Sequence, residues 1–284
     1  MSRSLEGKLA IITGASRGIG AAIAANLASK GCNLVLNYTS TSSTPTTTVL
    51  AASLITAHWI TAAPIQADLS SPTGPASLIA QAAAAFPTTT DGAPFRIDIL
   101  INNAGIALNA PIHSVTIPDF EATYRTNVLA PLLVVQAALP HLPTDRSGRI
   151  INISSVSSST GFVTQSVYGG TKAALEAMTR TWSRELAERA TVNAVNPGPV
   201  EGPMYAANPP EFMAGIKGWV MHTPLMAARE GVDSPEVVEE AEESGGRPAH
   251  TREVAGIVGM LCSADAAWCT GQVVCANGGM VMLH

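Results

Sequence analysis

The sequence predicts an α/β protein with a doubly wound parallel sheet of seven strands, covered by helices on both faces. Three observations support this fold. Short apolar runs alternate with longer helical segments, a glycine-rich turn joins the first run to the first helical segment, and 284 residues with 46% hydrophobic side chains can bury one large core. We therefore expect residues 1–284 to form a single domain.

The individual elements follow from run length, turn residues and caps. The first strand, residues 9–13, lies between Gly7 and Gly14, and Gly31 closes the helix at residues 19–30. Pro45 indicates a loop before the next helix, and Pro131 should kink the long one. We expect the other strands at 33–38, 65–69, 97–101, 148–155, 191–196 and 272–276, and the other helices at 46–57, 76–86, 119–142, 166–189 and 251–263.

Charge and composition exclude several classes of function. A net charge of −5 and a pI near 5.7 give no basic surface for nucleic acid. The four cysteines form no Cys-x-x-Cys pair, so we expect neither a metal site nor a disulfide framework. The N-terminus lacks a signal-peptide pattern, and no apolar run approaches the roughly 20 residues of a membrane span. We expect a cytoplasmic protein without a membrane partner.

A Tyr-x-x-x-Lys pair, Tyr168 and Lys172, is the first candidate for chemistry. Residues four apart on a helix share a face, so the ammonium can favour the phenolate and lower its pKa from about 10. Ser155 ends the preceding strand and can bring a hydroxyl to the same carbonyl oxygen. Such a pair also occurs on solvated helix faces, so the spacing alone leaves both interpretations open.

The glycine-rich turn predicts a phosphate-binding site. Gly14 permits a tight reversal, Gly18 lets the backbone approach a pyrophosphate, and Gly20 allows close packing of the helix, whose N-terminus supplies N–H groups. The spacing, Gly-x-x-x-Gly-x-Gly, is also compatible with a plain strand-turn-helix.

The end of the second strand indicates which dinucleotide fits. A carboxylate there would bind the ribose hydroxyls and repel a 2′-phosphate, but the chain reads Asn37-Tyr38-Thr39-Ser40 and has no acid before Asp68. Arg17 is the cation placed to meet such a phosphate, together with donors from Thr39 and Ser40. We therefore predict NADP(H) rather than NAD(H), unless Arg17 is simply solvated.

The order of the motifs resembles the classical short-chain dehydrogenase/reductase family over nearly the whole chain. The matching residues are the 13–20 turn, Asn102-Asn103-Ala104-Gly105, Asn127, Ser155, Tyr168, Lys172 and Asn196-Pro197-Gly198. The resemblance implies a Rossmann-type fold and the catalytic set Asn127, Ser155, Tyr168 and Lys172. The implied cofactor contacts are Gly14, Ser16, Arg17, Gly18, Ile19, Gly20, Asn37, Tyr38, Thr39, Ser40, Asp68, Leu69, Asn103, Ala104, Gly105, Tyr168, Lys172, Pro197, Gly198 and Val200.

The resemblance also implies individual roles. Asp68 would contact the adenine, although it could equally cap the helix that follows. Asn127 would hold a water that links Lys172 to solvent, and the backbone of Val200 would meet the nicotinamide carboxamide. Gly202 departs from the threonine of many relatives, which puts part of the anchoring of the ring in doubt.

Residues 203–247 are rich in methionine and apolar side chains, which predicts an adaptable lid over a hydrophobic substrate, with ordinary packing as the alternative. The seven carboxylates between 230 and 243 are interpreted as a solvated face. The tail from 280 to 284 could fold back towards the pocket.

The predicted activity is NADPH-dependent reduction of a hydrophobic ketone of the aromatic polyketide type, because the chain looks most like fungal-type ketoreductases. It also resembles 3-oxoacyl carrier-protein reductases, so a 3-oxoacyl thioester is an alternative substrate. A cofactor-binding scaffold without redox activity is the alternative of another class, and the complete Asn-Ser-Tyr-Lys set argues against it. The family further implies a homodimer or homotetramer, paired through its two long helices.

Overall fold

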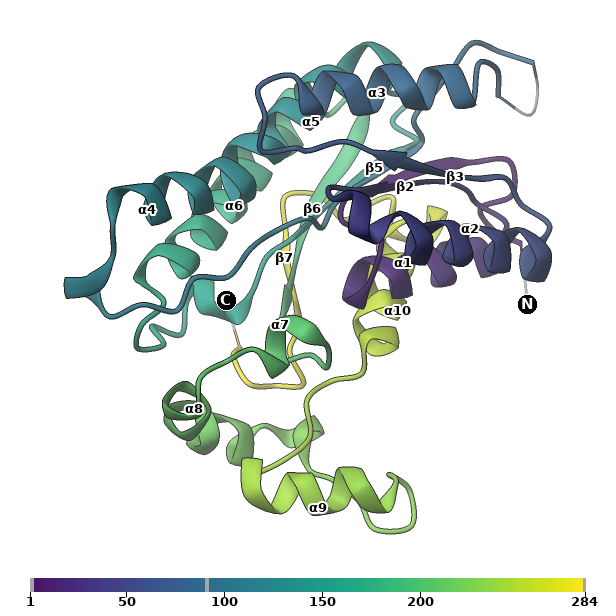
Figure 1. Ribbon diagram of the computed structural model, residues 1–284. Helices are drawn as coiled ribbons and strands as arrows, with labels where there is room; N and C mark the ends of the chain where they lie inside the picture. The colour runs from purple at the N-terminus through teal and green to yellow at the C-terminus, as the bar shows by residue number, and fades with distance from the viewer. Residues whose placement is uncertain (1–2, 90–91, 283–284) are drawn as a thin grey trace.

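The computed structural model describes residues 3–89 and 92–282 and contains one seven-stranded sheet (Figure 1). Its strand order is β3-β2-β1-β4-β5-β6-β7 and every pairing is parallel, which confirms the predicted fold. The order reverses between β1 and β4, where doubly wound sheets open a crevice at the carboxyl ends of their strands. The strands are β1 Leu9–Ile12, β2 Asn33–Tyr38, β3 Ala62–Gln66, β4 Ile99–Asn102, β5 Gly148–Ile153, β6 Ala190–Pro197 and β7 Val273–Ala276.

Helices cover both faces of the sheet (Figure 1). One core joins the sheet to α1 Gly18–Ser29, α2 Thr44–His58 and α10 Thr251–Leu261. A second core on the other face joins it to α3 Gly74–Ala85, α5 Ala130–Ala138 and α6 Ser166–Glu185. This arrangement explains why β1, β4 and β5 are buried along their whole length, as strands of a doubly covered parallel sheet are.

Two expected boundaries near the second strand are wrong. Helix α2 begins at Thr44 rather than at residue 46, because Pro45 lies in its first turn, where a missing N–H costs no helical hydrogen bond. Strand β3 lies three residues before the expected 65–69, and its Pro64 is tolerated because β3 is an edge strand. Asp68 therefore lies in the turn after β3, where its carboxylate accepts hydrogen bonds from the backbone N–H (3.0 Å) and hydroxyl (2.7 Å) of Ser70.

The long helix expected at 119–142 is divided. It consists of α4 Ile117–Tyr124, a π-helical turn at Arg125–Leu129, α5 and a final 3-10 turn. Pro131 has no N–H to offer the carbonyl of Asn127, four residues earlier, and the N–H of Ala130 bonds five residues back to Arg125. The disturbance expected around Pro131 therefore takes the form of a π turn that contains Asn127.

A helical segment is inserted between β6 and α10, on residues 203–247 (Figure 1). It contains α7 Pro203–Ala206, α8 Pro210–His222 and α9 Pro235–Ser244. Its small core joins Ile216, Val220 and Met226 to Val156 and to Met280 of the tail, so the start of the tail folds back against this segment. Residues 283–284 lie outside the described residues. None of the described helices combines the length and apolarity needed to cross a bilayer.

Candidate active site

The glycine-rich turn after β1 has the geometry of a dinucleotide cradle. Gly14 and Gly18 adopt φ values of +62° and +58°, in the left-handed region that glycine favours. A Cβ on Gly20 would lie 2.4 Å from the carbonyl oxygen of Gly14, so only glycine lets α1 approach the turn this closely. Arg17, the N-cap residue, adds no side-chain hydrogen bond to this turn within the described chain, so the helix N-terminus can accept an anion. These residues fit a pyrophosphate.

Thr13 joins the turn to the end of β4, a role that the sequence analysis missed. Its buried hydroxyl accepts hydrogen bonds from the backbone N–H groups of Asn103 (2.9 Å) and Ala104 (3.0 Å) and donates to the carbonyl of Ile101 (3.2 Å). The amide of Asn103 donates back to the carbonyls of Thr13 and Gly14. A threonine between the first strand and the glycine turn was the signal in the sequence that could have indicated this role.

Of the four cofactor contacts predicted at the end of β2, two are buried and two are exposed. Asn37 is buried, accepts a hydrogen bond from the N–H of Gly14 (3.3 Å) and donates to the carbonyl of Ala67 (3.1 Å), and Tyr38 is also buried. The Asn37 side chain therefore joins the glycine turn to the residue after β3. Thr39 and Ser40 are exposed, as is Arg17.

The other predicted contacts follow their strands at the same edge, because parallel strands end together. Gly202, which replaces the threonine of many relatives, has φ +131°. A threonine would rarely adopt this backbone conformation, so the glycine suits the local chain path. Val200 pairs with Ala249 in an isolated parallel bridge. Ser16 and Ile19 follow β1, and Asp68 and Leu69 follow β3. Asn103 to Gly105 follow β4. Pro197 is the last residue of β6, and Gly198 and Val200 follow it.

Ser155, Tyr168 and Lys172 come together beyond the end of β5. The Lys172 ammonium donates a 2.8 Å hydrogen bond to the carbonyl of Ile153, the last residue of that strand, and lies 5.7 Å from the centre of the Tyr168 ring. Ser155 lies near enough to the Tyr168 phenol to lower the pKa of that phenol. The Ser155 hydroxyl donates to that of Ser157 at 3.0 Å. The arrangement pairs two hydroxyls with one buried cation.

The electrostatics differ from the expectation that Lys172 lowers the pKa of Tyr168. Burial raises the pKa of the Tyr168 phenol, and the hydrogen bond with Ser155 opposes that rise only in part. Burial also lowers the pKa of Lys172 to about 8, against the raising influence of the Glu176 carboxylate. The expected direction for Tyr168 is wrong because desolvation of the phenol dominates and the ammonium is turned towards the carbonyl of Ile153.

Asn127 fixes the loop after β4 beside the lysine. Its buried side chain accepts from the N–H of Ile106 (2.9 Å) and donates to the carbonyl of Ile106 (2.8 Å) and to the hydroxyl of Thr171 (3.1 Å). A Cβ on Gly105 would lie 3.3 Å from the Asn127 amide oxygen and 3.5 Å from the Lys172 nitrogen. The side chain is fully engaged, so a water-holding role would fall to the main-chain carbonyl in the π turn.

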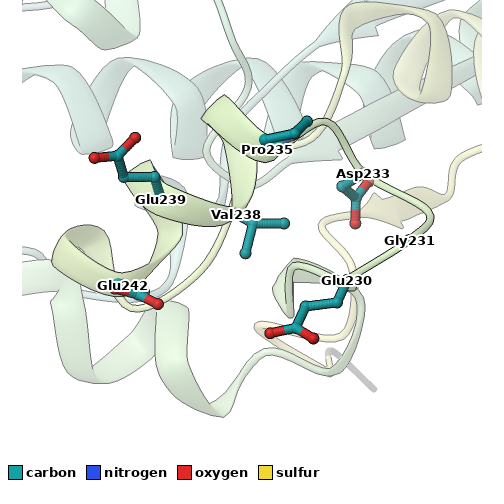
Figure 2. A pocket seen from close by; sticks show the side chains of 7 residues that line it. All are labelled: Glu230, Gly231, Asp233, Pro235, Val238, Glu239 and Glu242. Atoms are coloured by element: carbon teal, nitrogen blue, oxygen red, sulfur yellow. The ribbon is translucent and has the colours of Figure 1, made fainter.

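A hollow of about 500 Å³ lies elsewhere, between the loop at Glu230 and helix α9 (Figure 2). Asp233 on its wall is paired with Arg229 and Arg247. Among residues 3–89 and 92–282, no group of three His, Cys, Asp or Glu side chains is placed to hold a metal ion. The hollow lacks the hydroxyl and ammonium groups of the Ser155 site, so we do not place the active site there.

A family model described as short chain dehydrogenase matches residues 8–211, from β1 into α8. The chain belongs to the short-chain dehydrogenase/reductase family. The family resemblance inferred from the motifs is therefore confirmed. The match covers the glycine turn, Asn127, Ser155, Tyr168 and Lys172, and ends before α9, α10 and β7.

Relatives within this family include reductases of sugars. The chain is 58% identical to L-xylulose reductase from Aspergillus niger and 48% identical to L-xylo-3-hexulose reductase from Hypocrea jecorina, covering 99% of each chain in both pairs. Among solved structures, a blue fluorescent protein from a metagenomic library in complex with NADPH aligns with a TM-score of 0.81 and 33% identity, over 98% of this chain and 100% of that one. The angucycline C-6 ketoreductase LanV with bound NADP aligns with a TM-score of 0.81 and 31% identity, over 99% and 98%.

Proposed function

We propose that this short-chain dehydrogenase/reductase uses NADPH to reduce the keto group of an open-chain polyhydroxylated ketone to a secondary alcohol. The observation that carries the reaction class is the convergence of Ser155, Tyr168 and Lys172 beside a glycine turn that fits a dinucleotide. The 58% identity with an L-xylulose reductase supports a ketose as the substrate. Sequence motifs alone had favoured a hydrophobic ketone.

The chemistry of the protein is acid catalysis. NADPH, when bound, supplies the hydride that forms the new C–H bond. Ser155 and Tyr168 donate hydrogen bonds to the carbonyl oxygen, which takes the electron pair of the broken C=O π bond and the proton of Tyr168. The Lys172 ammonium stabilises the negative charge left on the phenol, and the carbonyl of Asn127 holds the water through which the proton is replaced.

Preference for NADP(H) follows from the charge around the end of β2. Arg17, Thr39 and Ser40 are exposed there, and the sequence contains no carboxylate between Asn37 and Asp68. A 2′-phosphate would meet one cation and two hydroxyls without electrostatic repulsion. Asp68, already engaged with Ser70, would contact the adenine from the next strand.

A hydrophobic or aromatic ketone of the polyketide type is the second candidate, favoured by one cluster of rings. Phe162 contacts Phe212 and Trp219 of α8 edge to face, with centroids 6.0 and 5.8 Å apart. A hydroxynaphthalene reductase-like protein from Metarhizium brunneum is 32% identical to this chain. The 3-oxoacyl thioester alternative is supported by 35% identity with a 3-oxoacyl-[acyl-carrier-protein] reductase from Aquifex aeolicus.

The same proposal includes a lid over the substrate, formed by residues 203–247. The packing of Ile216 and Val220 against Val156, the neighbour of Ser155, supports this role.

The proposal also includes a homodimer or homotetramer. Large apolar side chains exposed on α4 and its continuation, among them Phe120 and Leu129, support this assembly. Sedimentation velocity would test the assembly, and a monomer at micromolar concentration would contradict it.

The activity is tested by following NADPH oxidation with L-xylulose, a hydroxynaphthalenone and a 3-oxoacyl thioester as separate substrates. We expect the highest kcat/KM with L-xylulose. A higher value with the aromatic ketone would transfer the assignment to the second candidate. Absence of turnover with all three, despite NADPH binding, would favour the cofactor-binding scaffold.

A further inference from the structure

Three amide side chains from separate segments form one hydrogen-bonded row. The amide of Gln165 donates to the oxygen of Asn109 at 2.8 Å, and the amide of Asn109 donates to the oxygen of Asn208 at 2.7 Å. Asn208 in turn donates to the carbonyl of Tyr205 at 2.9 Å. The row joins the loop after β4 and the start of α6 to the end of α7.

The row begins next to the catalytic residues. Gln165 is the N-cap residue of α6, three residues before Tyr168, and its carbonyl accepts the N–H of Gly169 at 2.8 Å. Asn109 lies four residues after Gly105, which abuts the Lys172 ammonium. The loops that carry Asn109 and Gln165 are also tied by a 2.9 Å backbone bond from Ala110 to Thr164. The row therefore belongs to the segments that carry Tyr168 and the loop beside Lys172.

Two side-chain acceptors of residues that make up or contact this row have no hydrogen-bond partner among the described residues. One is the amide oxygen of Gln165, a residue only 7% exposed, and the other is the hydroxyl oxygen of Tyr205. Burial of a polar atom without a partner is costly, and such atoms in native proteins call for a ligand or another role. Both oxygens can accept a hydrogen bond from a hydroxyl group, and the Tyr205 hydroxyl can also donate one.

We propose that the row of Gln165, Asn109 and Asn208, with the hydroxyl of Tyr205, binds the hydroxyl groups of the substrate and makes the enzyme specific for a polyhydroxylated ketone. Neutral amides and a phenol are donors and acceptors at once, which matches the neutral, bifunctional hydroxyls of an open-chain sugar. A substrate without hydroxyls would leave the buried amide oxygen unpaired, and sites of this kind discriminate strongly against such analogues. This inference rests on the proposed reduction of a polyhydroxylated ketone and adds the residues that would recognise its hydroxyl groups.

The test compares two five-carbon ketones, L-xylulose and pentan-2-one, in the full-length enzyme with NADPH. Gln165→Met keeps the length of the side chain and removes its amide, and we expect the ratio of kcat/KM for L-xylulose to that for pentan-2-one to fall about 10- to 100-fold. Asn208→Ala, at the other end of the row, should lower the same ratio about 10-fold. Gln81→Met, the same change at an exposed position of α3, is the matched control and should leave the ratio unaltered.

The outcomes separate this inference from the reaction class. An unchanged ratio in both row variants, with unfolding midpoints equal to that of the wild type, would overturn the inference. Wild-type preference for pentan-2-one would also overturn it while leaving ketone reduction intact. Absence of NADPH oxidation by the wild type with either ketone would remove the proposed function itself, and the inference with it.

Discussion

The ammonium of Lys172 lies 5.7 Å from the centre of the Tyr168 ring, over its face. A cation at this distance is attracted by the ring quadrupole. A hydrogen bond from the ammonium to the carbonyl at the end of β5 fixes the position of the lysine. Ser155, rather than Lys172, is the residue that acts on the phenol oxygen and lowers its pKa. In the proposed reaction, the lysine would supply the positive charge and the tyrosine would supply the proton.

Tyr168→Phe should remove the proton donor without disturbing the fold. We expect kcat for ketone reduction to fall by about 10²-fold or more, because general acid catalysis contributes on that order. NADPH affinity, measured by fluorescence titration, should stay close to the wild-type value. Wild-type kcat in this variant would contradict the role of Tyr168.

The pH dependence of reduction should report Lys172. Burial lowers the pKa of this lysine to about 8, so its positive charge is present below that pH and lost as the pH rises through it. Burial raises the pKa of Tyr168, so the phenol still holds its proton in that range. We expect kcat/KM for reduction to decline above about pH 8, as measured across a constant-ionic-strength buffer series. A profile that is flat to pH 10 would exclude Lys172 as the titrating group.

Glu176→Gln tests the source of that decline. Glu176 is buried and accepts hydrogen bonds from the hydroxyls of Ser154 (2.6 Å) and Ser158 (2.8 Å), which a glutamine oxygen can also accept. Its negative charge raises the pKa of Lys172, so removal of the charge should move the alkaline decline to lower pH. A shift in the opposite direction would contradict the assignment.

Local motifs made most of the fold and site predictable from sequence. The glycine turn, Ser155 and the Tyr168–Lys172 pair depend on short spacings and strand ends, which a single sequence displays. The amide row could not be seen this way, because Gln165 is separated from Asn109 by 56 positions and Asn109 from Asn208 by 99. Such pairs depend on how the loops pack.

Burial explains the errors in the sequence-based predictions. The pKa of Tyr168 was expected to fall because the spacing to Lys172 is visible in the sequence, whereas desolvation of the phenol is not. Pro45 was placed in a loop before the helix, although proline is favoured in the first turn of a helix, where the structure has it.

Arg17→Ala should weaken the preference for NADPH. If the exposed guanidinium meets the 2′-phosphate, its loss should raise KM for NADPH about 10-fold and leave KM for NADH nearly unchanged, since one charge-assisted contact is removed. Steady-state kinetics with both cofactors measure the change. Arg184→Ala, at an exposed position in the last turn of α6, is the matched control and should alter neither KM. Equal effects on the two cofactors would show that Arg17 does not read the phosphate.

Gly20→Ala should destabilise the fold through a steric clash. A Cβ there would lie 2.4 Å from the Gly14 carbonyl oxygen and 2.6 Å from the Asn103 amide nitrogen. Forcing α1 away from the turn should cost about 1–3 kcal/mol of unfolding free energy and weaken NADPH binding, as followed by urea unfolding and cofactor titration. Gly18→Ala separates the clash from the backbone cost, because its Cβ would meet no described atom within 4 Å and it bears only the strain of φ +58°. Equal stability losses in the two variants would mean that close packing at Gly20 contributes nothing of its own.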